Sequence, residues 1–269
     1  MYLSDLLGNR INKKGLKYTH IMLMNVIAIP LNIGWVVIGT VLFLPAFFFM
    51  KFIQGYSTSF LTRKCIWIYG RVWQFILNPF CIFNLQKIQG QPFKNPGIIV
   101  VNHRSFFDTF CMNMMPIHDV CFAVRAWPFK MPLFNIFMKQ AGYLNIEAFS
   151  WKKTMDISKK NIKNNSFILF FPEGHRSKDN CMTNFYSGAF KMAIEHNVPV
   201  IPICLTGTQV LLPPSRYYFA PAKIKMKILD PVFPDQFTGD MKHVAFKKHV
   251  KNLMDNSIKQ MDEETIYNP

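Results

Sequence analysis

The stretch Val100–Asp108, with the sequence VVNHRSFFD, joins a predicted strand to a predicted helix. The apolar run Ile98–Val101 predicts a short buried strand, and Ser105 opens the helix with Asp108 in capping-box spacing. Because His103 and Asp108 are five residues apart, they lie about 140° apart around an ideal helix and would not share one of its faces. They can meet only if His103 lies in the turn before the helix.

In that arrangement the carboxylate of Asp108 would hold one ring nitrogen of His103 and leave the other to take a proton. The alternative is that Asp108 only caps a helix and His103 is a loop residue. The stretch taken alone does not decide between a catalytic pair and this structural arrangement.

A second apolar strand, predicted over Ser166–Phe171, runs directly into the sequence PEGHRS at Pro172–Ser177. This places a charged cluster at the end of a buried strand, and in open α/β sheets that edge is where ligands bind. An ordinary polar loop would not need Glu173 and Arg176 on either side of a glycine. The second stretch therefore favours a functional site.

Together the two stretches resemble the glycerophospholipid acyltransferase family, the lysophosphatidic-acid-acyltransferase-like enzymes. An Asn-His-x-Ser block that ends in Asp is matched by Asn102–Asp108, which includes the family's HxxxxD motif. A Phe-Pro-Glu-Gly-x-Arg-Ser block is matched by Phe171–Ser177, and a Val-Pro-x-x-Pro-Val-like strand by Val198–Ile203. The resemblance covers roughly residues 96–208.

The resemblance implies an α/β fold and acyl transfer from a thioester to a hydroxyl. His103 would be the general base, oriented by Asp108, and no acyl-enzyme is expected because the acceptor hydroxyl is itself the nucleophile. Glu173 and Gly174 would shape the acceptor pocket, and Arg176 would pair with a phosphate. The other positions that the resemblance assigns to substrate binding are Asn102, Ser105, Arg125 and Ser177.

One block departs from the family pattern. Where the family typically has Gly-x-Ile-Phe-Ile-Asp-Arg, this chain has GYLNIEA at Gly142–Ala148. The arginine associated with the glycerol-phosphate headgroup is absent, and Glu147 brings the opposite charge, which would repel a phosphomonoester dianion. This departure favours an acceptor lysophospholipid with a larger or cationic headgroup, or a lyso-aminolipid.

The chain has 269 residues, of which 50% are hydrophobic and 27 are Phe, and a net charge of +16. No Asp or Glu occurs from Leu6 to Phe107, and a surface of one sign suits anionic phospholipid headgroups or nucleic acid. The apolar segments favour the membrane, and no nucleic-acid-binding module accompanies the charge. The six cysteines are scattered without a Cys-x-x-Cys, so the sequence predicts neither a metal site nor a disulfide framework.

Residues Tyr18–Met50 carry no charged side chain, but prolines and glycines interrupt them. Three arrangements are open: one tilted spanning helix near Ile33–Met50, two spanning helices, or a re-entrant hairpin. Basic residues flank both ends, which mildly favours both ends being cytoplasmic. Arg63–Phe83 is interpreted as an amphipathic interfacial helix with a basic face, with an ordinary packing helix as the alternative.

After a linker at Gln89–Gly97, strands and helices alternate, which predicts a mixed, largely parallel sheet flanked by helices. The predicted elements are helices over Ser105–Met115, Pro132–Ala141, Trp151–Lys163 and Gly188–His196, and strands over Val120–Val124, at Phe167, at Val198 and over Lys223–Leu229. The expected organisation is membrane-embedded N-terminal helices over residues 1–88, an acyltransferase domain over residues 89–235 and a basic helical tail over residues 236–269. We interpret the tail as a solvated face.

These inferences predict a membrane O-acyltransferase with its catalytic domain on the cytoplasmic face. Acyl-CoA or acyl-carrier protein would be the co-substrate, a lysophospholipid the acceptor and membrane phospholipids the surroundings, with no cofactor. The alternative is a catalytically silent protein on the same fold that binds lipid or shapes membranes.

Overall fold

A seven-stranded sheet organises the chain, in the order β1-β7-β6-β2-β5-β3-β4. The computed structural model describes residues 3–86, 90–132, 134–177 and 181–267. Strands β6 and β7 are antiparallel, and every other neighbouring pair is parallel, so the predicted mixed, largely parallel sheet is confirmed. The strands are β1 (Ile82–Leu85), β2 (Ile98–Val101), β3 (Val120–Val124), β4 (Leu144–Asn145), β5 (Phe167–Phe170), β6 (Val200–Thr206) and β7 (Lys223–Ile228).

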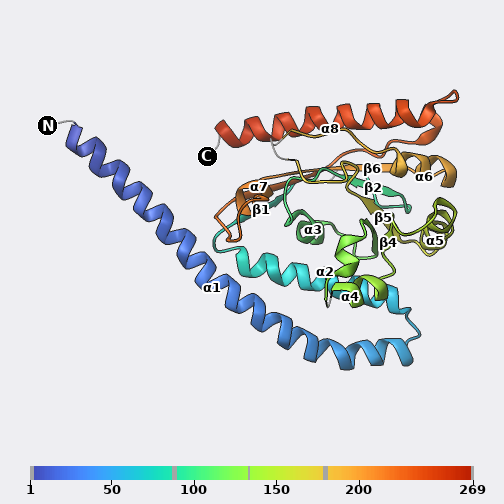
Figure 1. Ribbon diagram of the computed structural model, residues 1–269, viewed down its shortest axis with the longest axis horizontal. Coiled ribbons are helices and arrows are strands. Elements are labelled where there is room, and N and C mark those ends of the chain that lie inside the picture. Colours follow the sequence, from blue (N-terminus) through green and yellow to red (C-terminus); the bar gives the residue numbers. More distant parts are fainter. Residues whose placement is uncertain (1–2, 87–89, 133, 178–180, 268–269) are drawn as a thin grey trace.

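Helices cover both faces of this sheet (Figure 1). The α-helices are α1 (Leu3–Phe52), α2 (Thr58–Leu77), α3 (Asp108–Cys111), α4 (Phe134–Gln140), α5 (Trp151–Lys163), α6 (Gly188–His196), α7 (Thr208–Leu211) and α8 (Lys242–Tyr267). Three short 3₁₀ helices are η1 (Met112–Met114), η2 (Trp127–Lys130) and η3 (Pro234–Gln236).

The central strands are apolar along their whole length because both of their faces are covered. All four residues of β2 and all four of β5 are buried, as expected for parallel strands between two helical layers. Alternate residues of β2 point to different layers: Ile99 packs in the cluster with α1, α2 and α3, and Ile98 in the cluster with α5, α6 and α8. The sheet therefore separates two hydrophobic cores.

Helix α1 is one continuous helix of 50 residues, although Pro30 and Pro45 lie inside it. Of the three arrangements left open, the single helix is therefore the one present, and it is longer than the segment near Ile33–Met50 because the prolines and glycines do not interrupt it. Figure 1 shows that the helix bends along its length, which is the usual consequence of internal proline. The residues Tyr18–Phe52 are long and apolar enough to cross a membrane.

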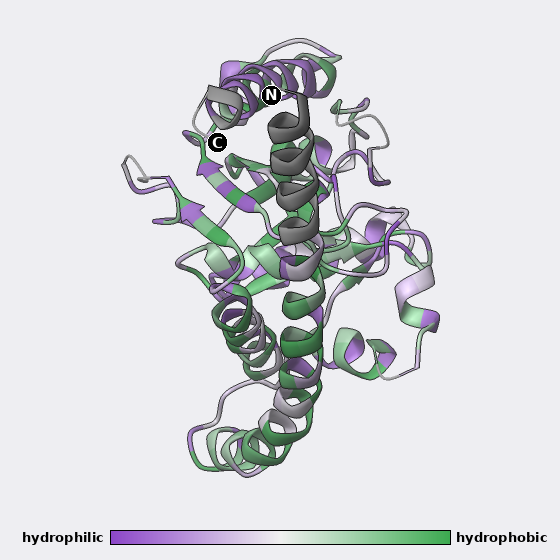
Figure 2. Cartoon of the chain, turned by 90° about the vertical axis from the view of Figure 1, so that its left-hand side faces the viewer, coloured by the Kyte–Doolittle hydropathy of each residue, from purple (hydrophilic) through white to green (hydrophobic). Residues whose placement is uncertain are grey.

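One side of α1 is attached to the sheet domain. Met24 and Ala28 are fully buried in the core that also contains α3. Asn25 donates from Nδ2 to the carbonyl of Phe219 and accepts from the amide of Phe219, each over 2.8 Å. The coloured part of α1 is largely hydrophobic (Figure 2), and side chains such as Val37 and Val41 in it are exposed.

The structure of α2 contradicts the interpretation of Arg63–Phe83 as an amphipathic interfacial helix with a basic face. The helix ends at Leu77, and Ile82–Leu85 is the edge strand β1, which places part of the sheet before the boundary predicted at residue 88. Arg63 is only 3% exposed and donates to Asp119 over 2.9 Å and to the carbonyl of Ala141 over 2.8 Å. On this side, α2 is a packing helix and not an exposed basic face.

Helix α8 shows that the C-terminal tail is more than a solvated face. Its residues Phe246, Val250 and Met254 are fully buried in the core formed with α6 and the sheet. Their spacing of four residues places them on one side of the helix, while Lys248 and Lys259 are exposed on the opposite side. The prediction was therefore wrong for one face of this helix.

Candidate active site

The carboxyl ends of three neighbouring strands hold the predicted site residues. Strand β5 lies between β2 and β3, parallel to both. The turn after β2, the loop after β5 and Arg125 after β3 therefore meet at one edge of the sheet, where ligands bind in open α/β folds.

The predicted pair of His103 and Asp108 is present. Nδ1 of His103 lies 2.8 Å from Oδ2 of Asp108, and the imidazole ring stacks on Phe171 with 4.4 Å between ring centres. Asp108 is fully buried, whereas 18% of the His103 side chain is exposed. Because Nδ1 is held by the carboxylate, Nε2 is the nitrogen left to exchange a proton.

The same carboxylate oxygen shapes the turn that carries the histidine. Oδ2 of Asp108 also accepts from the amides of Arg104 and Ser105, over 2.7 and 2.8 Å. The predicted helix beginning at Ser105 is shorter than expected: α3 starts at Asp108, and η1 follows it. Asp108 therefore both caps the start of the turn and holds His103, so the contacts expected from the two alternatives are made by one residue.

The carboxylate of Glu173 joins the loop after β5 to the turn that carries His103. The side chain is 1% exposed; its Oε1 accepts from the amide of His103 over 2.7 Å, and its Oε2 from the amide of Thr183 over 2.9 Å. Burial raises the pKa of this carboxyl above its ordinary value, while the amides of Thr183 and His103 act in the opposite direction. Glu173 thus positions His103 through its backbone.

Gly174 occupies a position that excludes a side chain. Its φ of +69° lies in the left-handed region, and a Cβ there would stand 2.7 Å from the ring of Tyr186. A glycine lets the loop turn sharply away after Glu173. Arg176, two residues on, is exposed at the surface of the same loop.

Three further predicted residues form hydrogen bonds between the turn that carries His103 and neighbouring segments. Asn102 exchanges two hydrogen bonds with the backbone of Leu205 in β6, over 2.8 and 2.9 Å. Ser105 donates from its hydroxyl to the carbonyl of Leu212 over 2.6 Å, and the amide of Ser177 donates to the carbonyl of His103 over 2.8 Å. All three side chains are buried, so their contacts within the described chain hold the site together.

Arg104, between His103 and Ser105, has a partner that no motif predicts. Its Nη1 and Nη2 lie 3.2 and 2.9 Å from the two carboxylate oxygens of Asp262 in α8. The arginine is 4% exposed. The residues are 158 positions apart, and Asp262 lies in a charged stretch without a motif, so the sequence contained no signal for this contact.

Arg125 forms an ion pair with the residue that departs from the family pattern. Its Nε lies 2.7 Å from Oε1 of Glu147, and Oε2 of Glu147 accepts from the amide of Ala126 over 2.7 Å. Nη1 of Arg125 is 3.5 Å from the carbonyl of Gly174. The pair is therefore at the rim of the same site, and the charge that Glu147 brings is accompanied by a guanidinium.

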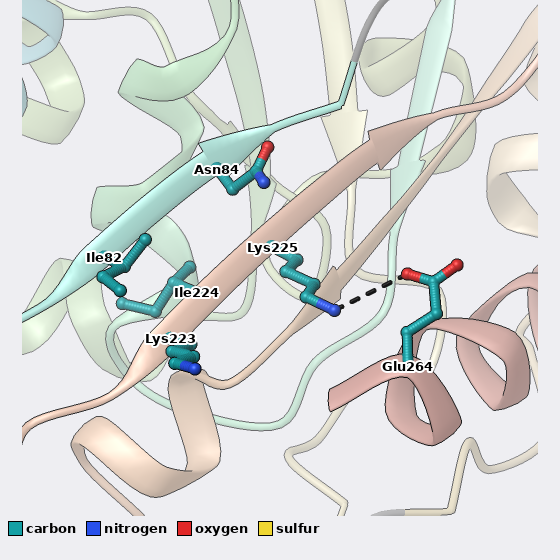
Figure 3. A pocket seen from close by; sticks show the side chains of 6 residues that line it. All are labelled: Ile82, Asn84, Lys223, Ile224, Lys225 and Glu264. Atoms are coloured by element: carbon teal, nitrogen blue, oxygen red, sulfur yellow. Dashed lines mark ion pairs between the residues drawn. The ribbon is translucent and has the colours of Figure 1, made fainter. Parts of the chain in front are cut away.

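Two cavities lie outside this cluster. One, of about 300 Å³, lies at the outer edge of the sheet beside the ion pair of Lys225 and Glu264, 3.5 Å apart (Figure 3). The other, of about 350 Å³, lies between α6 and the start of α8. Neither is lined by a residue of the two motifs. Within the described ranges, no three His, Cys, Asp or Glu side chains are grouped so that they could hold a metal ion.

Residues 82–206 match the family model described as Acyltransferase. This range contains the turn that carries His103, the Glu173 loop and the whole of strands β1 to β6. These residues are therefore similar to the acyltransferase family, and the resemblance to the glycerophospholipid acyltransferases is confirmed.

Curated relatives share the same description. The chain is 29% identical over 156 residues to the chloroplastic 1-acyl-sn-glycerol-3-phosphate acyltransferase LPAT1 of Arabidopsis thaliana, covering 56% of this chain and 44% of that protein. It is 27% identical over 175 residues to the 1-acyl-sn-glycerol-3-phosphate acyltransferase of Saccharomyces cerevisiae, covering 62% and 57%. The chain spans about half the length of the curated relatives it matches.

A solved structure shares the fold. The crystal structure of the 1-acyl-sn-glycerophosphate acyltransferase PlsC from Thermotoga maritima superposes with a TM-score of 0.75 at 22% identity. The match covers 91% of this chain and 98% of that one. At this identity the likeness establishes the arrangement of helices and strands.

Proposed function

We propose that this chain is a membrane-associated O-acyltransferase that moves a fatty acyl group from a thioester to the hydroxyl of a lysophospholipid. The observation that carries the proposal is the His103–Asp108 pair, joined over 2.8 Å within the acyltransferase domain. Both curated relatives described above are named for acyl transfer to a glycerophospholipid. The proposed donors are acyl-CoA and acyl-carrier protein.

In the proposed mechanism, Nε2 of His103 takes the proton of the acceptor hydroxyl as its oxygen attacks the thioester carbonyl carbon. The new C–O bond forms, the tetrahedral intermediate collapses with cleavage of the C–S bond, and the imidazolium returns the proton to the leaving thiolate. Asp108 holds the tautomer with Nδ1–H and stabilises the imidazolium. No residue of the chain becomes acylated.

The remaining site residues would position the reactants. Arg176 is exposed on the Glu173 loop and would bind a lipid or donor phosphate in fork geometry. Glu173 would keep the backbone of His103 in place, and Gly174 would shape the acceptor pocket by letting the loop turn beside Tyr186. Asn102, Ser105 and Ser177 would act indirectly, by fixing the turn.

The test is transfer of a labelled acyl group by the purified full chain in lipid vesicles, with both donors and a panel of lysophospholipids. Wild type should acylate a panel member, and His103→Ala should lower the rate about 10²–10⁴-fold, the usual contribution of a general base. His175→Ala, an exposed histidine on the neighbouring loop, is the matched control and should retain activity. Vesicle binding without transfer by wild type would favour the silent lipid-binding alternative.

We also propose that the acyltransferase domain faces the cytoplasm. Cys181 is exposed, whereas the other five cysteines are buried or half-buried, so a membrane-impermeant maleimide reports mainly on its side of the membrane. Labelling should require opening of the cell, and Cys181→Ser should abolish it. Labelling of intact cells would reverse the proposed orientation.

A further inference from the structure

The ion pair at the rim of the site is exposed on both of its side chains. Arg125 is 53% exposed and Glu147 is 40% exposed on the side-chain scale. The amide of Ala126, followed by the hydrogen bond from Arg125, lowers the pKa of Glu147, so this carboxylate is ionised at neutral pH. A positive and a negative group are therefore presented together beside the Glu173 loop.

Neither partner uses all of its hydrogen-bonding capacity in the described contacts. An arginine has five N–H donors and a carboxylate about four lone-pair positions. Arg125 donates from Nε to Glu147 and from Nη1 towards the carbonyl of Gly174, and Glu147 accepts one bond on each oxygen. Arg125 therefore keeps N–H donors for an anionic group of a ligand, and Glu147 keeps lone pairs for a cationic group.

We infer that Arg125 and Glu147 together select a lysophospholipid whose headgroup carries both a phosphodiester and an ammonium group. Arg125 would bind the phosphodiester through its terminal nitrogens, and Glu147 would accept hydrogen bonds from the ammonium group. This inference rests on the proposed acyl transfer and names the acceptor class. In this inference Glu147 helps to determine which acceptor headgroup the protein selects.

The charges around the pair favour this ligand over a phosphomonoester. Lys130 is exposed and acts on Glu147 in the same direction as Arg125, and Arg176 lies on the adjoining loop, so an anion is attracted to this rim. A phosphomonoester dianion carries no cationic group of its own that could pair with the carboxylate of Glu147. A zwitterionic headgroup satisfies both members of the pair, which gives discrimination by complementary charge.

The experiment compares three acceptors with the same acyl chain. Lysophosphatidylethanolamine supplies phosphodiester and ammonium, lysophosphatidylglycerol supplies the phosphodiester without the cation, and lysophosphatidic acid supplies the phosphomonoester. We expect wild type to show a KM for the ethanolamine lipid about tenfold below that for the glycerol lipid, which corresponds to about 1.4 kcal/mol. The kcat values for these two acceptors should be similar.

Glu147→Gln removes the charge and keeps an oxygen that can accept from the amide of Ala126. We expect this variant to lose the preference for the ethanolamine lipid over the glycerol lipid and to improve on wild type with lysophosphatidic acid. Glu195→Gln, an exposed carboxylate on α6, is the matched control and should keep the wild-type ratios. Equal KM values in wild type, a wild-type preference for lysophosphatidic acid, or a uniform effect of Glu147→Gln on all three acceptors would overturn the inference.

Binding separates this inference from the proposed reaction. Titration calorimetry of His103→Ala with the same three lysolipids measures headgroup selection without turnover. A preference for the ethanolamine lipid that disappears in His103→Ala/Glu147→Gln supports selection by the pair even if no acyl group is transferred. Loss of transfer together with unselective binding rejects both proposals.

Discussion

A single carboxylate oxygen, Oδ2 of Asp108, organises the catalytic turn at the scale of residues. It accepts from Nδ1 of His103 and from the amides of Arg104 and Ser105. In Asp108→Asn the amide oxygen can still accept from the two backbone amides, but it no longer has the charge that stabilises an imidazolium. We therefore expect a correctly folded variant with kcat lowered about 10²–10⁴-fold and little change in KM.

The measurement is steady-state acyl transfer with thermal unfolding of the same samples. Since the lost charge acts on His103, the pH dependence of kcat should also move, which a purely structural defect would not cause. Retention of wild-type kcat by Asp108→Asn would contradict the proposed role of the carboxylate.

His196 supplies a second residue-scale prediction, on stability. Its Nε2 lies 2.6 Å from the hydroxyl of Ser158, and burial, followed by the charge of Lys159, lowers its pKa while Glu195 acts in the opposite direction. A histidine whose pKa is lower in the folded chain contributes stability that is present above its unfolded pKa of about 6.5 and is lost as the pH falls through the folded value. Wild type should therefore lose more unfolding free energy than His196→Gln when the pH is lowered from 7.5 to 5.

Denaturant unfolding at the two pH values measures this difference. His118, whose pKa is also lowered by burial, is common to both proteins, so the comparison isolates His196. Parallel losses in wild type and His196→Gln would show that the Ser158 contact does not depend on a neutral imidazole.

Among the elements, α8 reaches from the far side of the sheet into the catalytic turn through Asp262. Arg104 is buried and its guanidinium lies against both oxygens of this carboxylate. Asp262→Asn leaves one acceptor oxygen and removes the charge, so we expect a several-fold loss in kcat because the turn next to His103 is less firmly held. Asp255→Asn, which breaks the ion pair with Lys251 on the same helix, is the matched control.

Steady-state acyl-transfer assays measure the difference in kcat between the two variants. The unfolding temperatures of the same variants test for a general effect on α8. A loss in kcat that is the same for Asp262→Asn and Asp255→Asn would assign the effect to the helix as a whole. A defect confined to Asp262→Asn, and rescued by Asp262→Glu, would assign it to the pair with Arg104.

The elements whose bounds the sequence predicts correctly are those whose apolar spacing is complete within the element. Strand β3 and helices α5 and α6 have the predicted bounds, because their apolar spacing and the turns that follow them are complete within each segment. Strand β1 was missed because its burial alternates only weakly and its pairing partner β7 is far along the chain. The continuity of α1 was missed because proline and glycine lower helix propensity but do not prevent a long helix.

The sequence predicted the candidate site only where its residues lie in continuous motifs. The residues that carry the chemistry occur in two continuous motifs, and the structure brings His103, Asp108, Glu173 and Arg125 to one edge of the sheet. Their supports come from separate segments and use backbone groups or one carboxylate of a charged stretch: Thr183, Leu205, Leu212 and Asp262. No sequence pattern marks such contacts, since any residue can supply a carbonyl or an amide.

At the scale of the whole molecule, α1 gives the sheet domain a long apolar extension. Val37 and Val41 are 60% and 65% exposed, and a charge placed at the centre of a spanning helix costs about 2.5–3.5 kcal/mol. We therefore expect Val37→Lys/Val41→Lys to lower the fraction of protein that floats with phospholipid vesicles. The fold should be retained because neither residue belongs to the core.

Vesicle flotation and circular dichroism of the same preparation measure the two effects. Leu253→Lys, at a residue of α8 that is 37% exposed, adds charge on the opposite side of the sheet and should leave flotation unchanged. Wild-type flotation by the double variant would show that this part of α1 is not the segment that enters lipid.

The contact between Arg104 and Asp262 has a consequence for the order in which the protein becomes functional during synthesis. Translation proceeds from α1 to α8 at about 5–20 residues per second, so the apolar helix leaves the ribosome roughly 10–40 s before the carboxylate that completes the contact. A nascent chain can therefore be anchored at a bilayer while the turn around His103 still lacks its last support. We therefore expect the apolar helix to be available for attachment before the turn around His103 is complete.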